Sequence, residues 1–218
     1  MSDFVDDHFV QAAICGVFSP ALPVSAFKMK VLRDAEVYGE QEKAEFLYKV
    51  VSGAVRTYTI SEDGRRQIDA FHLPGDVFGF ETGPLHRFSA EAIADSEIIA
   101  ASRSAIERAA EQDGAAAREL WAMTARQLAR VCDHMLMLGR KGAAERVVSF
   151  LLEMSARDQQ SKDVTLPMSR TDIADYLGLT IETVSRCFSQ LGRSHAIELN
   201  GARKVKLRDV RALEAMAA

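Results

Sequence analysis

The chain has 218 residues, enough for one large or two modest domains with a sizeable core. Hydrophobic residues make up 48% and charged residues 27%, which is typical of soluble globular proteins, and no apolar run approaches the roughly 20 residues that span a bilayer. The first residues are acidic and lack the basic region of an export signal, so we expect a cytoplasmic protein with no membrane contact.

The net charge of −4 is unevenly distributed along the chain. Residues 140–218 contain 13 Lys/Arg and 10 Asp/Glu, a net charge of +3, whereas residues 1–139 carry −7. An acidic chain as a whole is unusual for a nucleic-acid binder. The C-terminal part alone has the sign that contact with phosphate requires.

No constellation of residues indicates an enzyme or a metal site. The three cysteines, Cys15, Cys132 and Cys187, are far apart, which suits a reducing compartment. The five histidines share no metal-ligand spacing and are expected as surface or half-buried polar residues: His8, His72, His86, His134 and His195. There is no G-x-S-x-G motif and no glycine-rich phosphate loop. We therefore expect neither catalysis nor a cofactor.

Short strands dominate the N-terminal half. Residues 1–20 have little periodicity, although a short helix over 9–17 is compatible with their apolar positions. Two β-rich runs, 46–51 and 54–60, are separated by a glycine, and Asp63-Gly64 then predicts a hairpin turn. Short strands separated by glycines from about residue 24 to 102 indicate a β-roll or jelly roll.

A linker helix over 102–113 and a long helix over 115–138 follow. The long helix has an apolar seam at three–four spacing: Trp121, Thr124, Leu128, Val131, Met135 and Leu138. A second flank consists of Leu120, Met123 and Leu136. The seam could simply pack on the β-roll, but two flanks allow one to meet the roll and the other a second subunit. We predict a homodimer through 115–138, with Gly139 ending the helix and a hinge at 140–142.

The segment 169–191 predicts two short helices joined by a tight turn. Ser169 caps the first helix with Asp172 in a weak capping box, Gly178 ends it, and Thr180 caps the second. The buried side of the second helix is expected to consist of Ile181, Val184, Phe188 and Leu191.

Elements on both sides complete a winged helix. A helix over 143–156 precedes the bihelical segment, and a hairpin over 195–207 follows it with Asn200-Gly201 as a two-residue type I′ turn. Arg203, Lys204 and Lys206 on this wing can meet phosphates or can form an ordinary solvated strand face.

The other face of the second helix carries Glu182, Ser185 and Arg186 within one turn. In a helix-turn-helix this region meets base edges in the major groove, where arginine grips guanine and a carboxylate accepts from cytosine. On an isolated helix, Glu182 and Arg186 would be an ordinary surface ion pair at i, i+4. The bihelical context favours DNA reading.

This segment resembles the DNA-binding motif of the Crp/Fnr transcription regulators. Glu182-x-x-Ser185-Arg186 is similar to the readout triplet of the Fnr branch, whereas the Crp branch usually has arginine where this chain has Ile181 and glycine where it has Ser185. The likeness is greatest to FixK-type regulators. It implies TTGA and TCAA half-sites, activation in contact with RNA polymerase, and a role in low-oxygen adaptation. Fnr proper holds an iron–sulfur cluster on clustered N-terminal cysteines, and this chain has only Cys15 there.

The β-rich half resembles the cyclic-nucleotide-binding fold of the same family. There a glycine–glutamate pair and an arginine–serine pair hold ribose and phosphate, but here Gly79 is followed by Phe80, and the segment containing Arg87 and Ser89 matches only loosely. A pocket filled by its own side chains, or an unknown small ligand, is expected instead. The weak ligand-binding candidates are Gly79, Arg87 and Ser89.

These observations predict an α+β protein of three parts: a β-roll over 1–113, a dimerisation helix over 114–139 and a winged helix-turn-helix over 140–218. The predicted DNA-binding residues are Glu182, Ser185, Arg186, Ser169, Arg170, Thr180, Thr183 and Lys204. Cys187, next to Arg186, is a predicted redox site whose oxidation would lower operator affinity, or else a small half-buried residue. Two other functions remain open: a regulator gated by an effector in the β-roll, and a repressor or partner-docking module.

Overall fold

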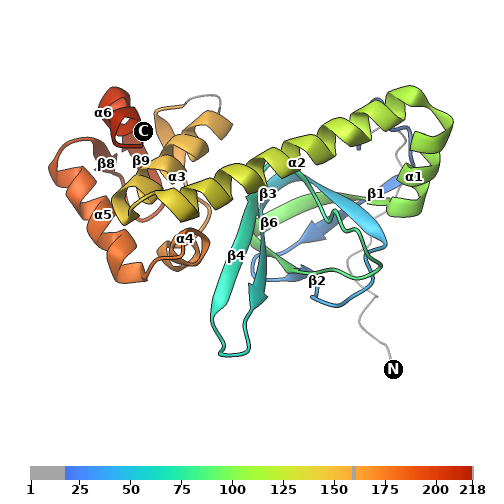
Figure 1. The fold of residues 1–218 in the computed structure, drawn as a ribbon, viewed down its shortest axis with the longest axis horizontal. Coiled ribbons are helices and arrows are strands. Elements are labelled where there is room, and N and C mark those ends of the chain that lie inside the picture. Colours follow the sequence, from blue (N-terminus) through green and yellow to red (C-terminus); the bar gives the residue numbers. More distant parts are fainter. Residues whose placement is uncertain (1–17, 159–160, 218) are drawn as a thin grey trace. The chain divides into compact units, whose positions relative to one another are not determined.

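The computed structural model describes residues 18–158 and 161–217 (Figure 1). Contacts divide this part of the chain into two compact units, one up to Ala129 and one from Arg130 onward. The helix predicted over 9–17, together with His8 and Cys15, lies outside the described residues. Among the helices that are described, none has the length and apolar character needed to cross a membrane.

The first unit is an antiparallel β-roll, as predicted (Figure 1). Its strands are β1 (Ala26–Val31), β2 (Glu36–Tyr38), β3 (Phe46–Ile60), β4 (Arg66–His72), β5 (Val77–Phe78) and β6 (Ser89–Ser102). The sheet order is β1-β6-β3-β4, with β2 pairing to β6 and β5 to β3. The aromatic and β-branched residues of β3 and β6 alternate between the two faces, and their inward members build the apolar interior of the roll.

β3 is one long strand, whereas the sequence predicted two runs separated at Gly53. The chain continues through Gly53 at φ +85°, and the pairing register with β6 shifts around it. A methyl group on Gly53 would lie 2.3 Å from Ser96 Oγ and 2.4 Å from the Asp95 carbonyl oxygen. The glycine therefore marks a bulge with a close backbone approach inside the strand.

Two helices follow the roll: α1 (Arg103–Gln112) and α2 (Gly114–Arg140). The Asp113 side chain accepts a hydrogen bond from Ala115 N at 2.8 Å and so caps the start of α2. The predicted stop at Gly139 is wrong, because α2 continues to Arg140 and Gly139 does not take a left-handed φ. A side chain caps this end instead, since Arg146 Nη2 donates to the Leu138 carbonyl at 2.7 Å.

The two apolar flanks of α2 differ in burial. Met123 is buried in the core of the roll with Leu120 packed against it, as predicted. Leu136, predicted on the same flank, is exposed, and its turn buries Met137 instead. On the other flank Trp121 is 76% exposed. Its neighbours along the seam, Leu128, Val131 and Met135, are also exposed.

The second unit is a winged helix. Its elements after α2 are α3 (Ala143–Arg157), β7 (Asp163–Thr165), α4 (Arg170–Leu177), α5 (Ile181–Arg193), β8 (Ile197–Leu199), β9 (Lys204–Leu207) and α6 (Val210–Ala217). The three strands form a small sheet in the order β7-β9-β8. The apolar face predicted for α3 is confirmed as buried: Val147, Val148, Phe150, Leu151 and Met154.

The wing turn is wider than predicted. Asn200 N donates to the Lys204 carbonyl at 2.9 Å, so the connection is longer than two residues. Gly201 has φ +82°, but Asn200 is not among the described residues with positive φ. A type I′ turn needs positive φ at both central positions, and that prediction is wrong.

Candidate nucleic-acid interface

The entry to the helix-turn-helix is fixed by reciprocal capping. Ser169 Oγ accepts from Asp172 N at 3.1 Å, and Ser169 N donates to Asp172 Oδ2 at 2.9 Å. Gly178 then takes the left-handed conformation at φ +61° and ends α4. Thr180 Oγ1 accepts from the backbone N–H of Thr183 at 3.2 Å and starts α5. The capping box, the glycine stop and the second cap are therefore confirmed.

α5 buries one side and exposes the other. The side chains predicted to face the core are buried at three positions, Val184, Phe188 and Leu191. Ile181 was predicted there too, but it is 41% exposed. Ile181 is the first residue of α5, where the preceding turn leaves it at the edge of the packed surface. The amphipathic helix is otherwise as the sequence indicates.

The exposed side brings together the three predicted base-reading residues. Glu182, Ser185 and Arg186 are all exposed in the first turns of α5. Hydrogen bonds from the Glu182 backbone and from Thr180 lower the pKa of the Glu182 carboxyl, more than the Arg186 charge does. Arg186 Nη2 donates to Thr183 Oγ1 at 3.3 Å. The face thus presents an ionised acceptor, a hydroxyl and a guanidinium to the outside.

Arg170, predicted to contact DNA, packs against the inner side of α5. Its guanidinium carbon lies 3.2 Å from the ring centroid of Phe188. Burial lowers the pKa of Arg170 to about 10, so the side chain remains cationic at neutral pH. The stacked cation fixes the inner side of α5 against the start of α4. No local pattern predicts this contact, because the two residues lie on different helices.

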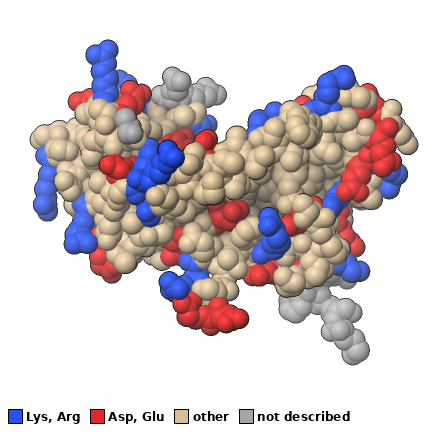
Figure 2. Space-filling model, in the orientation of Figure 1, with Lys and Arg blue, Asp and Glu red and all other residues tan. Residues whose placement is uncertain are grey.

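The wing offers fewer free cations than its sequence suggests. Lys206 Nζ lies 3.6 Å from Asp163 Oδ1 on the neighbouring strand, and Arg203 is half-buried. Lys204 at the start of β9 is exposed. In Figure 2 several basic side chains project along the edge of the unit that contains α5 in Figure 1. Lys204 is the wing residue best placed to meet a phosphate.

Cys187 lies on the inner side of α5. It is 9% exposed, and burial raises the pKa of its thiol while the neighbouring Arg186 acts in the opposite direction. A raised pKa reduces the thiolate fraction at neutral pH. The redox role of Cys187 stays a prediction. Its burial and raised pKa favour the alternative, a small residue packed on the inner side of the helix.

Comparison with known proteins agrees with this geometry. The Crp-like helix-turn-helix domain matches residues 145–216, and the cyclic nucleotide-binding domain matches residues 28–113. The nitrogen fixation regulation protein FixK of Azorhizobium caulinodans is 48% identical over 186 residues, which cover 83% of this chain and 75% of that protein. The chain belongs to the Crp/Fnr family.

Further Crp/Fnr relatives support the whole architecture. FixK of Rhizobium meliloti is 42% identical, with 83% of this chain and 82% of that protein covered. The structure of FixK2 from Bradyrhizobium japonicum is 53% identical and has a TM-score of 0.86, with 89% of this chain and 98% of that chain covered. Crp/Fnr regulators bind DNA and act as dimers, so this chain is a DNA-binding transcription regulator.

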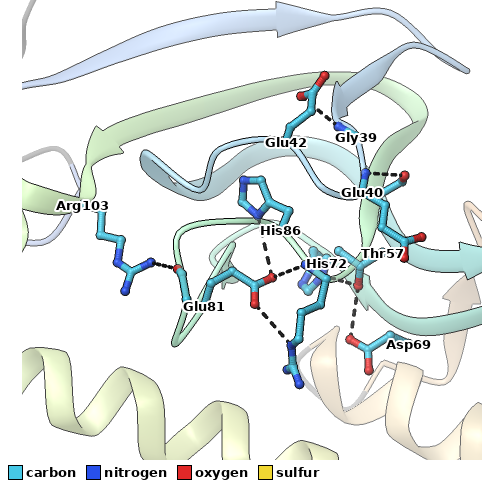
Figure 3. A network of polar contacts seen from close by, with 12 residues as sticks. Gly39, Glu40, Glu42, Thr57, Asp69, His72, Glu81, His86 and Arg103 are labelled. Carbon is cyan, nitrogen blue, oxygen red and sulfur yellow. Dashed lines mark hydrogen bonds and ion pairs between the residues drawn. The ribbon is translucent and has the colours of Figure 1, made fainter.

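The β-roll matches the cyclic nucleotide-binding domain, but its polar residues contact one another (Figure 3). Gly79 at φ +88° lies against Tyr48, and Phe80 packs on the apolar core of the roll. The Glu81 side chain is only 5% exposed, and its carboxylate accepts from Arg87 N at 3.0 Å and Arg87 Nε at 3.3 Å. The remaining candidate, Ser89 Oγ, accepts from Glu40 N at 2.9 Å.

His86 closes the same region. Its ring is 0% exposed and stacks on Tyr38 with 3.6 Å between centroids. Its Nδ1 lies 3.7 Å from Glu81 Oε1 (Figure 3). Arg103 Nη1 donates to the Gly83 carbonyl at 2.7 Å and holds the connecting loop. The Glu81 carboxylate and the Ser89 hydroxyl thus already accept hydrogen bonds from the protein, whereas neither ring nitrogen of His86 has a hydrogen-bond partner among the described residues. The buried carboxylate repels a phosphate. These residues do not fit a cyclic nucleotide.

The histidine predictions need correction. His72 and His86 were expected at or near the surface, but both are buried. Thr57 Oγ1 lies 3.1 Å from His72 Nε2 and 3.4 Å from Asp69 Oδ2 (Figure 3). Because the hydroxyl has one proton and Asp69 can only accept while ionised, His72 Nε2 is the donor to Thr57. The hairpin predicted at Asp63-Gly64 pairs β3 with β4, and the register shift between Thr57 and Tyr58 was not predicted from the sequence.

Proposed function

We propose that this regulator reads a palindrome with TTGA and TCAA half-sites as a homodimer and activates transcription in adaptation to low oxygen. The observation that carries the proposal is the exposed triplet Glu182, Ser185 and Arg186 at the start of α5. An arginine and a carboxylate one turn apart can read neighbouring G·C pairs in the major groove. The names of relatives agree, including a transcriptional activatory protein and a fumarate and nitrate reduction regulatory protein. Such a regulator works in the cytoplasm and contacts RNA polymerase.

Selection of bound DNA from a random pool, with purified protein and no added effector, tests the base preference. We expect enrichment of TTGA and TCAA in an inverted repeat. A gel shift on this duplex against a scrambled duplex of equal composition then measures the specificity ratio at a fixed salt concentration. Equal affinity for both duplexes would contradict the proposed readout.

The dimer contact is proposed along the exposed seam of α2. Trp121, Leu128 and Met135 expose large apolar side chains on one helix face, and a second copy with two-fold symmetry would bury them. A combined Leu128→Glu and Met135→Glu change is expected to raise the subunit dissociation constant about 100-fold, because it buries unpaired charge. Sedimentation velocity across a concentration series measures this constant. Leu32→Glu changes an exposed apolar residue of the β-roll and is the matched control. It should leave the subunit dissociation constant unchanged.

The alternative of an effector-gated regulator makes a different prediction. The Glu81 carboxylate is buried and already bound to Arg87, and the His86 ring is fully buried. Both observations argue against a cyclic nucleotide as effector. Titration of cyclic nucleotides into protein and operator DNA is expected to leave the dissociation constant unchanged. A saturable increase in operator affinity would establish gating and contradict the constitutive binding proposed here.

A further inference from the structure

Arg146 on α3 joins the ends of two other helices. Its Nη2 donates to the Leu138 carbonyl in the last turn of α2 at 2.7 Å, and its Nε donates to the carbonyl of Lys141, the residue after α2, at 2.8 Å. Its Nη1 donates to the Leu177 carbonyl at 3.0 Å, at the end of α4. One half-buried guanidinium therefore satisfies carbonyls from both helix termini.

These contacts are strong for a physical reason. The last carbonyls of a helix lack partners within the helix and carry the negative end of its dipole, so a cation is stabilised there. The planar guanidinium presents several donors in a fixed geometry, so the three hydrogen bonds set direction as well as distance. A lysine at this position could not hold both helix ends in the same way.

The position of Leu177 connects this contact to α5. Leu177 is the last residue of α4 and is followed by the left-handed Gly178, after which Thr180 caps α5. A methyl group on Gly178 would lie 3.6 Å from Arg146 Nη1, so the guanidinium packs directly against the turn. The start of α5 is thereby tied to the end of α2 through one side chain.

A second contact follows the same line between α2 and α4. The rings of His134 and Tyr176 stack with centroids 4.0 Å apart and an interplanar angle of 16°. Burial and the charge of Arg146 both lower the pKa of His134, so the ring is neutral at pH 7. Lys141 Nζ additionally donates to Ser149 Oγ at 2.9 Å and to the Ala217 carbonyl. The end of α2 is thus part of the compact winged-helix unit.

We propose that Arg146 is a positioning residue that determines which spacing between half-sites the dimer accepts. The inference rests on the proposed function, because it requires that α2 forms the dimer contact. In a two-fold dimer, the angle between α2 and α5 in each subunit sets the separation of the two recognition helices. Half-sites one duplex turn apart, about 34 Å, must match that separation. Loss of the Arg146 hydrogen bonds allows the angle between α2 and α5 to vary, so the dimer can bind half-sites at other spacings.

The test measures dissociation constants for a series of duplexes. The series contains the palindrome at the spacing preferred in the pool selection, the same half-sites with one base pair added or removed, and a single half-site. Wild-type protein is expected to prefer the original spacing. Arg146→Met is expected to lower this preference about tenfold, the factor that corresponds to one charge-assisted hydrogen bond, and to keep its affinity for the single half-site.

Two further variants define the outcomes. Arg140→Met removes the same charge from an exposed position at the end of α2, and it should keep the spacing preference. Arg146→Lys keeps the charge but loses the planar guanidinium, and it should lower the spacing preference by a smaller factor, about threefold. If Arg146→Met does not fold, Arg146→Lys is the variant that tests the proposal. An unchanged preference in the folded Arg146 variants, or an equal loss on the single half-site, overturns the proposal. A wild-type protein without preference for any palindrome would instead overturn the proposed function itself.

Discussion

The β-roll and the winged helix use similar sets of polar residues in opposite ways. In the β-roll, the Glu81 carboxylate is buried and bound to Arg87, and the neighbouring His86 is enclosed by aromatic rings. In the winged helix, Glu182 and Arg186 stand exposed on α5. Groups that are satisfied inside the protein cannot offer hydrogen bonds to a ligand without first breaking their own. Groups that are hydrated can exchange water for base edges at low cost.

This contrast predicts that the β-roll can be destabilised without loss of base reading. Gly53→Ala is expected to lower the free energy of unfolding by about 3 kcal/mol or more, because the added methyl group meets Ser96 and Asp95 and the φ of +85° is unfavourable for alanine. Chemical denaturation followed by circular dichroism measures the change. The fraction that remains folded should select the same DNA sequence as wild-type protein.

Gly64→Ala is the matched control for this change. Gly64 also has a positive φ, +79°, but a methyl group there would have no neighbour within 4 Å. Only backbone strain remains, so the expected loss is about 1 kcal/mol. Equal losses for the two variants would contradict the close approach at Gly53.

The winged helix should respond in the opposite way, with altered base reading at unchanged stability. Arg186→Ala is expected to cost about 2 kcal/mol of binding to the TTGA site and to blur the base preference at one half-site position. Arg193→Ala removes an equal charge from the far end of α5 and should cost much less at every sequence alike. Competition gel shifts with single-base variants of the site measure both. An Arg186→Ala protein with the wild-type preference would show that another side chain reads that base.

Features that depend on nearby residues could be predicted from the sequence, and features that depend on distant segments could not. Capping residues and the glycine stop of α4 act within a few residues, and the 3.6-residue period located α3 and the buried side of α5. Features that depend on distant segments were missed. The local pattern predicts a break between strands at Gly53, because its crowding comes from β6. It predicts only a DNA contact for Arg170, because Phe188 lies on another helix. The inward burial of His86 likewise depends on Tyr38, which is remote in sequence.

The stability of the β-roll should depend on pH through the buried His86. Burial lowers the pKa of His86 below the ordinary 6.5, so the unfolded chain binds a proton before the folded one and stability falls as the pH falls below about 6.5. His86→Phe keeps a ring beside Tyr38 but removes the titration, so its stability should fall less than that of wild-type protein between about pH 7.5 and 5.5. Denaturant midpoints at several pH values measure the difference. His195→Asn removes an exposed imidazole outside the β-roll and is the control variant for the substitution itself.

The smallest effect is expected at the wing, where a single exposed cation contributes charge but no sequence information. Lys204→Ala should weaken binding to all duplexes by about 0.5 kcal/mol and reduce the slope of log affinity against log salt by about 0.9, because one fewer phosphate is neutralised. Lys30→Ala removes the same charge from an exposed position on the β-roll and should leave the slope unchanged. If both variants lowered the slope equally, the effect would arise from net charge rather than from a phosphate contact at the wing. A loss confined to TTGA sites would instead assign Lys204 to base reading, and the division between phosphate contact on β9 and base contact on α5 would not hold.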